Sequence, residues 1–199
     1  MKKQYHQQAL KLSFFTVGYN IIEGVSAFIF GALTSSTALV AFALDSFIES
    51  ISASTMIWRF RKHRTDAEEE ATEKRAYKIV GYSFLILGAY VLYESLSKLL
   101  QKEEPERSLF GVIVATASLI IMPILFKAKY RLGKQIASKS LVADSRQTLV
   151  CVMLSAILLV GTGLNYFFGI WWTDPAAAIL IAIFLLRESF EMRKGHAHH

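Results

Sequence analysis

The stretch Leu109–Phe126, LFGVIVATASLIIMPILF, runs for 18 residues without a charged side chain. About 20 apolar helical residues cross a hydrocarbon core of about 30 Å, so a block of this kind predicts a transmembrane helix. Similar apolar blocks recur along the 199-residue chain, which is 53% hydrophobic, and charged residues gather in the short segments between them. The sequence therefore predicts an all-α, polytopic membrane protein with no room for a separate soluble domain.

We expect a single transmembrane domain over residues 1–199, built from six transmembrane helices. The expected spans are about 10–33, 37–57, 77–97, 109–126, 141–167 and 175–187. The first block is not the pattern of a cleavable signal peptide, because Asn20 and Glu23 interrupt it. The charged segment 59–78 is interpreted as a solvated link. A helical extension of the third span is the alternative, since Glu70 and Lys74 have i, i+4 spacing. No internal repeat is evident.

The distribution of Lys and Arg predicts the orientation in the membrane. Of the 22 such residues, eighteen fall in the N-terminal segment, the links 59–78 and 127–140 and the C-terminal tail, and three fall in the links of the opposite side. The positive-inside rule therefore predicts cytoplasmic N and C termini in a multi-pass protein of the cell (inner) membrane. This asymmetry accounts for the net charge of +6 without a nucleic-acid partner. The single cysteine excludes a disulfide scaffold and any zinc module with several cysteines.

Ionisable side chains inside the expected spans are costly in a bilayer and are often functional. Asp45 and Glu49 are separated by one helical turn in the middle of the second span, so they share one face of the helix. Asn20 and Glu23 lie near the midpoint of the first span. One face of the fifth span carries Asp144, Gln147, Cys151 and Ser155.

The depth of these groups follows from the direction of each span. The second and fifth spans run in opposite directions, so as neighbours they would bring Asp45 level with Cys151, and Glu49 level with Gln147. The cation expected near this cluster is Arg146, close to the cytoplasmic edge. Buried carboxylates without a matching cation take up protons or a metal ion. Oxygen, amide and thiol ligands together suit Zn²⁺ better than Ca²⁺ or Mg²⁺.

Structural roles are the alternative for the polar residues of the spans, because such residues also hydrogen-bond to neighbouring helices. We favour this interpretation for Asn20, Thr148 and Ser155, and it stays open for Gln147 and Cys151. Asp174, directly before Pro175, is expected to be hydrated or to cap a helix.

The six-span layout with an acidic pair in the second span resembles the cation diffusion facilitator family. That family's second span reads S-x-A-L-x-A-D-A-x-(H/D)-S-x-x-D, and its two ligand positions fall on Asp45 and Glu49. Its fifth-span pattern, A-D-A-x-H-x-x-x-D, falls on 143–151. The remaining matches are Ser36, Ala38, Leu39, Ala41 and Ala43 in the second span, Asn20 in the first, and Trp172, Asp174 and Pro175 at the start of the sixth.

The resemblance implies a carrier that exports a divalent metal ion, usually zinc, in exchange for protons, and that is commonly a homodimer. It implies no prosthetic group, since the metal is the substrate. The implied ligands come from the second and fifth spans: Asp45, Glu49, Cys151, Gln147 and Asp144. Gln147 and Cys151 replace the family's His and Asp, so ligation is expected to shift to Asp144 or to include Glu23. The chain is expected to belong to a short, transmembrane-only branch without the family's cytoplasmic domain.

Two functions are alternatives to transport. A non-transporting metal-binding sensor or accessory subunit of the membrane fits the acidic pair equally well. An enzyme is not expected, because the spans contain no Ser/His or paired-Asp catalytic arrangement. The C-terminal histidines His196, His198 and His199 either collect metal or form an unstructured end, and we favour the second interpretation.

Overall fold

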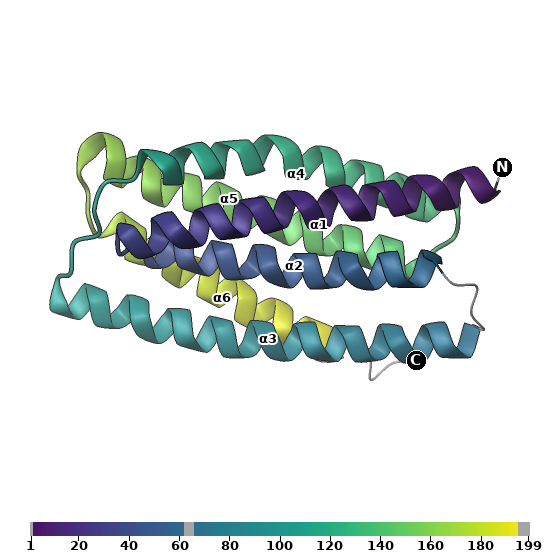
Figure 1. The fold of residues 1–199 in the computed structure, drawn as a ribbon. Coiled ribbons are helices and arrows are strands. Elements are labelled where there is room, and N and C mark those ends of the chain that lie inside the picture. Colours follow the sequence, from purple (N-terminus) through teal and green to yellow (C-terminus); the bar gives the residue numbers. More distant parts are fainter. Residues whose placement is uncertain (1, 62–65, 195–199) are drawn as a thin grey trace.

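The protein is described by a computed structural model that covers residues 2–61 and 66–194. Within these residues six helices lie side by side in one bundle, and the start of α1 and the end of α6 point toward the same end of it (Figure 1). The helices are α1 (Lys2–Leu33), α2 (Thr37–Arg61), α3 (Asp66–Gln101), α4 (Leu109–Gln135), α5 (Lys139–Phe168) and α6 (Thr173–Lys194). The predicted all-α class is confirmed.

Five of the six helices, α1 to α5, are long and apolar enough to cross a membrane. In α6 the apolar run Ala176–Leu186 is bounded by Asp174 and by Arg187. At 1.5 Å per residue this run is roughly 16 Å long, about half of a hydrocarbon core. The helix nevertheless packs along α3 and α5. The protein is therefore a multi-pass membrane protein whose sixth helix depends on its neighbours for burial.

The helices extend beyond the predicted spans, mainly at the ends assigned to the cytoplasm. Helix α3 begins at Asp66, so the helical extension of the third span, the alternative for the segment 59–78, is confirmed. Helix α4 continues from Phe126 to Gln135. The length of an apolar block reflects the thickness of the bilayer, whereas a helix ends only where capping or turn residues end it.

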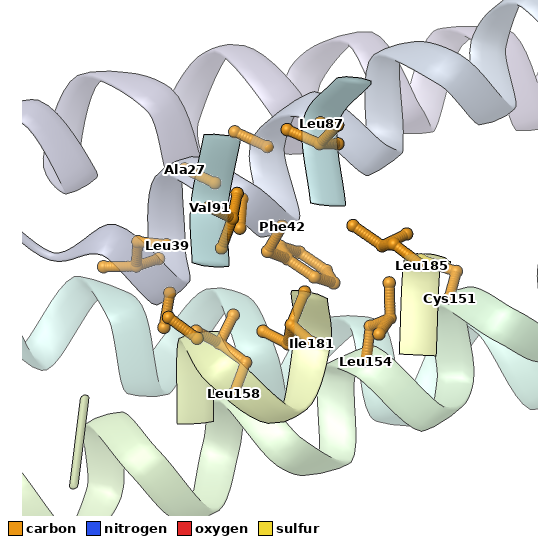
Figure 2. Packing of buried hydrophobic residues seen from close by; sticks show 14 of the residues in the cluster. Ala27, Leu39, Phe42, Leu87, Val91, Cys151, Leu154, Leu158, Ile181 and Leu185 are labelled. Atoms are coloured by element: carbon orange, nitrogen blue, oxygen red, sulfur yellow. The ribbon is translucent and has the colours of Figure 1, made fainter. Parts of the chain in front are cut away.

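Helices α2 and α5 form the centre of the bundle. Helix α2 contacts α1, α3, α5 and α6, and α5 contacts α2, α4 and α6. Their inner faces meet in an apolar core near Phe42, where Leu154, Leu158 and Ile181 also lie (Figure 2). Large apolar side chains on α1, α3 and α4 point outward, as expected of a surface that faces lipid. The centre of the bundle can therefore hold polar groups away from the lipid.

The turns that join α1 to α2 and α4 to α5 have the same backbone geometry. In each turn one residue adopts a positive φ, 54° at Ser35 and 52° at Ala137. The next residue, Ser36 or Ser138, donates its backbone N–H to a carbonyl oxygen five residues earlier at 2.9 Å. Its hydroxyl accepts a hydrogen bond from the backbone N–H three residues later, at 3.1 Å and 3.3 Å respectively. Both turns are therefore capped by a serine in the same way.

These two helical hairpins can be aligned through their shared turn. They run in opposite directions through the bundle, and aligning Ser36 with Ser138 brings Asp45 onto Gln147 and Glu49 onto Cys151. Inverted repeats are common in transporters, whose binding sites lie where the repeats meet. The two hairpins resemble such a repeat in their shared turn and their opposite directions. Identity between them is confined to a few positions, among them Gly31 with Gly133, Leu39 with Leu141, and Val40 with Val142.

Candidate functional site

The acidic pair of α2 points into the bundle and not toward lipid. Asp45 is 1% exposed and Glu49 is fully buried. Two hydrogen bonds join α2 directly to α5: Thr148 donates to Glu49 Oε1 at 2.5 Å, and Ser52 donates to Asp144 Oδ1 at 2.9 Å. The prediction that the second and fifth spans are neighbours is confirmed.

A first group of polar side chains surrounds Asp45. The Cys151 thiol and the carboxylates of Glu49 and Glu23 are close enough to Asp45 to act on it electrostatically. The Ser118 hydroxyl of α4 lies within hydrogen-bonding reach of both Cys151 and Glu23. The prediction that Asp45 is level with Cys151 is confirmed, and α1 and α4 also contribute to this group.

Glu23 connects α1 to the acidic pair. It is 5% exposed, and its Oε2 accepts a hydrogen bond from Ser46 of α2 at 2.9 Å. The Tyr19 hydroxyl, one helical turn earlier, is also within hydrogen-bonding reach of its carboxylate. Because Ser46 directly follows Asp45, these contacts hold Glu23 beside the acidic face of α2.

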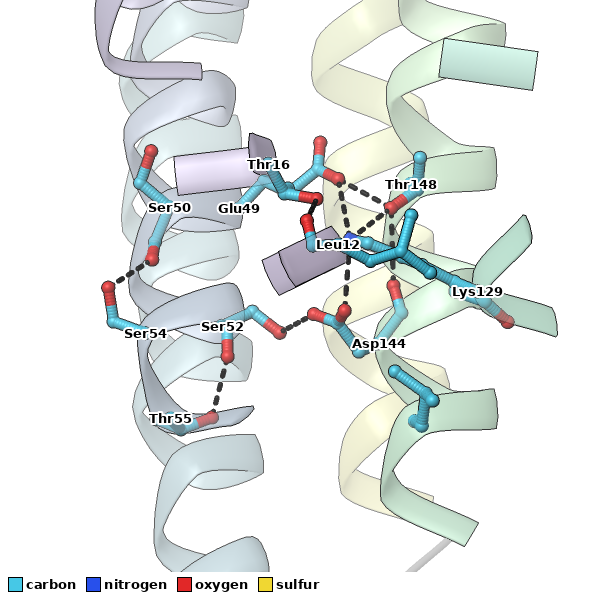
Figure 3. A network of polar contacts seen from close by, with 12 residues as sticks. Leu12, Thr16, Glu49, Ser50, Ser52, Ser54, Thr55, Lys129, Asp144 and Thr148 are labelled. Carbon is cyan, nitrogen blue, oxygen red and sulfur yellow. Dashed lines mark hydrogen bonds and ion pairs between the residues drawn. The ribbon is translucent and has the colours of Figure 1, made fainter. Parts of the chain in front are cut away.

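A second group, nearer the end assigned to the cytoplasm, is centred on a lysine. Lys129 of α4 is fully buried, and its Nζ lies 2.9 Å from Asp144 Oδ2 and 3.6 Å from Glu49 Oε1. The same ammonium donates a hydrogen bond to Thr148 Oγ1 at 2.9 Å. Figure 3 shows Lys129 reaching between α2 and α5 so that three oxygens surround its Nζ. Glu49 therefore lies at the junction of the two groups.

Lys129 overturns the expected charge balance. Arg146, the expected nearby cation, is exposed, whereas Lys129 was counted in the basic link 127–140. The signal that would have found it is spacing. Lys129 continues a stripe of buried residues that recur every three or four positions along α4: Ala115, Ser118, Met122, Leu125, Lys129 and Leu132.

Several buried polar atoms have no hydrogen-bond partner among the described residues. They include one carboxylate oxygen each on Glu23, Asp45 and Glu49, and also both amide atoms of Asn20. An unpaired buried oxygen costs free energy, and a cation can compensate for that cost. Within the described ranges, however, no three His, Cys, Asp or Glu side chains are gathered as a ready metal site. Metal binding would thus require side chains to converge.

The remaining predicted residues differ in what they contact. Gln147 is buried, and its amide nitrogen has no hydrogen-bond partner among the described residues. The residue that bonds to Glu49 is the next one, Thr148, although Gln147 was expected to lie level with Glu49. Ser155 donates to Ser118 at 2.8 Å, so its structural role is confirmed, as is that of Thr148. The hydrogen bond expected for Asn20 is not formed with any described residue. Whether Gln147, Asp144 or Cys151 binds metal stays a prediction.

Asp174 lies at the opposite end of the bundle from Lys129. It is 2% exposed, and its Oδ1 accepts a hydrogen bond from Ser36 at 2.5 Å. The backbone N–H groups of Thr37 and Ala38 also bond to its carboxylate. Asp174 therefore caps the beginning of α2. This contact ties α6 to the turn between α1 and α2. The histidines of the tail, His196, His198 and His199, lie outside the described residues.

Comparison with known proteins gives a consistent picture. Residues 13–195 match the cation efflux transmembrane domain. Two relatives are described as cadmium, cobalt and zinc/H(+)-K(+) antiporters. The one from Bacillus velezensis is 26% identical over 97% of this chain and 62% of its own length. The one from Bacillus subtilis is 27% identical over 97% of this chain and 63% of its own length.

A relative from Xenopus laevis, named Transmembrane protein 163, is 25% identical over 92% of this chain and 66% of its own length. The chain thus spans between 62% and 66% of the length of these three relatives. The family match covers most of the chain, in agreement with the motif residues of the second span. This protein belongs to the cation efflux family, and its resemblance to the cation diffusion facilitators is confirmed.

Proposed function

We propose that this chain transports a divalent metal cation, with Zn²⁺ as the first candidate, out of the cytosol in exchange for protons. The observation that carries the proposal is the group formed by Asp45, Glu49, Glu23 and Cys151. These side chains come from three helices, are buried within the bundle, and include three carboxylate oxygens that no described residue bonds.

The proposed substrate site consists of Asp45, Glu49 and Cys151, with Gln147, Asp144 and Glu23 as further candidates. Carboxylate oxygen and thiolate sulfur are both ligands of Zn²⁺, whereas Ca²⁺ and Mg²⁺ prefer oxygen alone. The printed names of the two Bacillus relatives support a divalent transition-metal substrate. With no histidine among the proposed ligands, proton exchange would depend on the carboxylates.

A sensor or accessory subunit that binds metal without transporting it is the second candidate. It is favoured by one observation: within the described residues no ready cluster of three metal ligands exists, and Glu49 is already paired with Lys129. A homodimer, which the family resemblance implies, is a further proposal for either function.

The decisive experiment measures metal and proton fluxes in proteoliposomes that contain the purified chain alone. Zn²⁺, Mn²⁺, Fe²⁺, Co²⁺ and Cd²⁺ are each applied, with one indicator for the metal and another for internal pH. We expect metal uptake coupled to proton counterflow, and we expect Asp45→Asn and Glu49→Gln to abolish it. Glu94→Gln is the matched control, since this carboxylate on α3 forms a partly exposed ion pair with Lys98.

Each outcome separates the candidates. Normal flux in both Asp45→Asn and Glu49→Gln would exclude the proposed site. Metal binding by the wild-type chain without any flux would favour the sensor. Loss of flux in Glu94→Gln as well would indicate a general defect in folding or insertion.

A further inference from the structure

A buried ammonium already occupies a cation-binding position beside the proposed metal site. Lys129 Nζ has three oxygen neighbours, at 2.9 Å, 2.9 Å and 3.6 Å, from Asp144, Thr148 and Glu49. Two of these neighbours are carboxylates, and all four residues are at most 3% exposed. A lysine surrounded in this way has the same electrostatic role as a bound monovalent cation.

Glu49 cannot bind this ammonium and a metal ion independently of each other. Its Oε1 faces Lys129 and Thr148, while its Oε2 has no partner among the described residues and the carboxylate also acts on Asp45. A divalent ion bound between Asp45 and Glu49 would lie within a few ångströms of a fixed positive charge. In a low-dielectric interior such repulsion is strong, because little water screens it.

We propose that Lys129 is a tethered competitor of the metal substrate, whose ammonium must withdraw from Glu49 before a divalent ion can bind between Glu49 and Asp45. This inference rests on the proposed function and adds a residue that sets the affinity of its site. Lys129 weakens metal binding, and in return it keeps Glu49 and Asp144 charge-compensated when no metal is bound.

Comparison of the two hairpins supports a role for this charge beyond packing. Under the alignment of Ser36 with Ser138, Lys129 corresponds to Ala27 and Asp144 corresponds to Phe42. Ala27 and Phe42 are buried in the apolar core (Figure 2). At these aligned positions α1 and α2 therefore carry apolar residues, whereas α4 and α5 carry an ion pair.

The test is equilibrium metal binding by the full chain in detergent, with Zn²⁺ and Co²⁺ titrated against a chromophoric chelator. We expect Lys129→Met to lower the dissociation constant by at least about tenfold. We expect Lys129→Arg, which keeps the charge, to stay within about threefold of wild type. Lys127→Met is the matched control, because it removes an exposed positive charge from the same helix and should leave the affinity unchanged.

The thermal unfolding midpoint gives a second readout. Zn²⁺ should raise the midpoint of Lys129→Met more than that of wild type, because ligand binding to the native state stabilises it. Should Lys129→Met not fold, Lys129→Gln serves for both measurements. An unchanged or weaker affinity in a folded neutral variant would overturn the inference while leaving the proposed function intact. Equal affinities in wild type and Asp45→Asn would overturn the proposed site and the inference with it.

Discussion

The ion pair between Lys129 and Asp144 gives the sharpest prediction about stability. At an effective dielectric constant of about 20, unit charges attract by roughly 6 kcal/mol at the 2.9 Å that separates Lys129 Nζ from Asp144 Oδ2. The 3.6 Å contact with Glu49 contributes roughly 5 kcal/mol by the same relation. The desolvation of three buried charges offsets much of this gain. Removing one partner of a buried pair nevertheless costs about 3–5 kcal/mol.

The two single substitutions should differ. Asp144→Asn leaves Lys129 compensated by Glu49, so we expect a loss of about 3 kcal/mol in unfolding free energy, the lower end of that range. Lys129→Met leaves two buried carboxylates facing each other, so we expect a loss of about 5 kcal/mol in unfolding free energy. The double variant retains a single carboxylate. Its loss of unfolding free energy should be smaller than the sum of the losses in the two single variants, by a coupling energy of about 2–3 kcal/mol.

The assay is reversible unfolding in mixed micelles of a mild detergent and dodecyl sulfate, with a chelator present so that no metal contributes. The control is the same cycle on Glu94 and Lys98, whose 3.7 Å pair is partly exposed. That pair should couple by less than about 0.5 kcal/mol. A coupling between Lys129 and Asp144 as small as that of the control pair would refute the argument that this network is buried and mutually compensating.

Four further outcomes follow from local geometry. Ser36→Ala should lower the unfolding free energy more than Ser138→Ala, by about 1.5 kcal/mol, because Ser36 also donates to the carboxylate of Asp174; detergent unfolding curves of the two variants provide the comparison. Gly133→Ala should cost about 1–3 kcal/mol, because a Cβ there would lie 2.9 Å from a side-chain carbon of α5. Gly18→Ala, with open space around the site, should be neutral or stabilising in the same assay. The Cys151 thiol, fully buried, should resist a membrane-permeant maleimide until the protein is unfolded; rapid labelling of the native protein would contradict its position.

The pairing of α2 with α5 could be predicted from the sequence because it depends on few physical rules. Helical periodicity puts Asp45 and Glu49 on one face, and charges avoid lipid, so this face had to turn toward another helix. A constant rise per residue then fixes which groups are level when the partner runs the other way. These rules sufficed for the contact between Asp45 and Cys151. They placed Gln147 level with Glu49, whereas the residue that bonds to Glu49 is Thr148, one position further along α5.

Lys129 was missed because hydropathy defines the apolar block and not the end of the helix. The block ends at Phe126, but α4 continues to Gln135, and the buried stripe of α4 continues with it. A long lysine stem can lie along apolar neighbours while its ammonium reaches carboxylates on other helices. The positive-inside rule places every Lys of the basic link on the cytoplasmic side, whereas a Lys is fully buried only when it is paired. The pairing partners, Glu49 and Asp144, are distant in sequence and become visible only in three dimensions.

The likeness of the two hairpins is hard to see in the sequence, because they agree where the turns require it and differ where the polar groups lie. Both turns need a glycine for close approach and a serine as cap, so these positions are shared. The buried positions away from the turns are under no such common constraint. The acidic pair of α2 corresponds to Gln147 and Cys151. The ion pair of Lys129 with Asp144 corresponds to Ala27 and Phe42. Sequences depart from local consistency mainly at functional sites. The two hairpins differ at most aligned positions. Among these, the positions of Asp45, Glu49, Lys129 and Asp144 carry the buried charges, so substitution there should alter metal binding rather than folding topology.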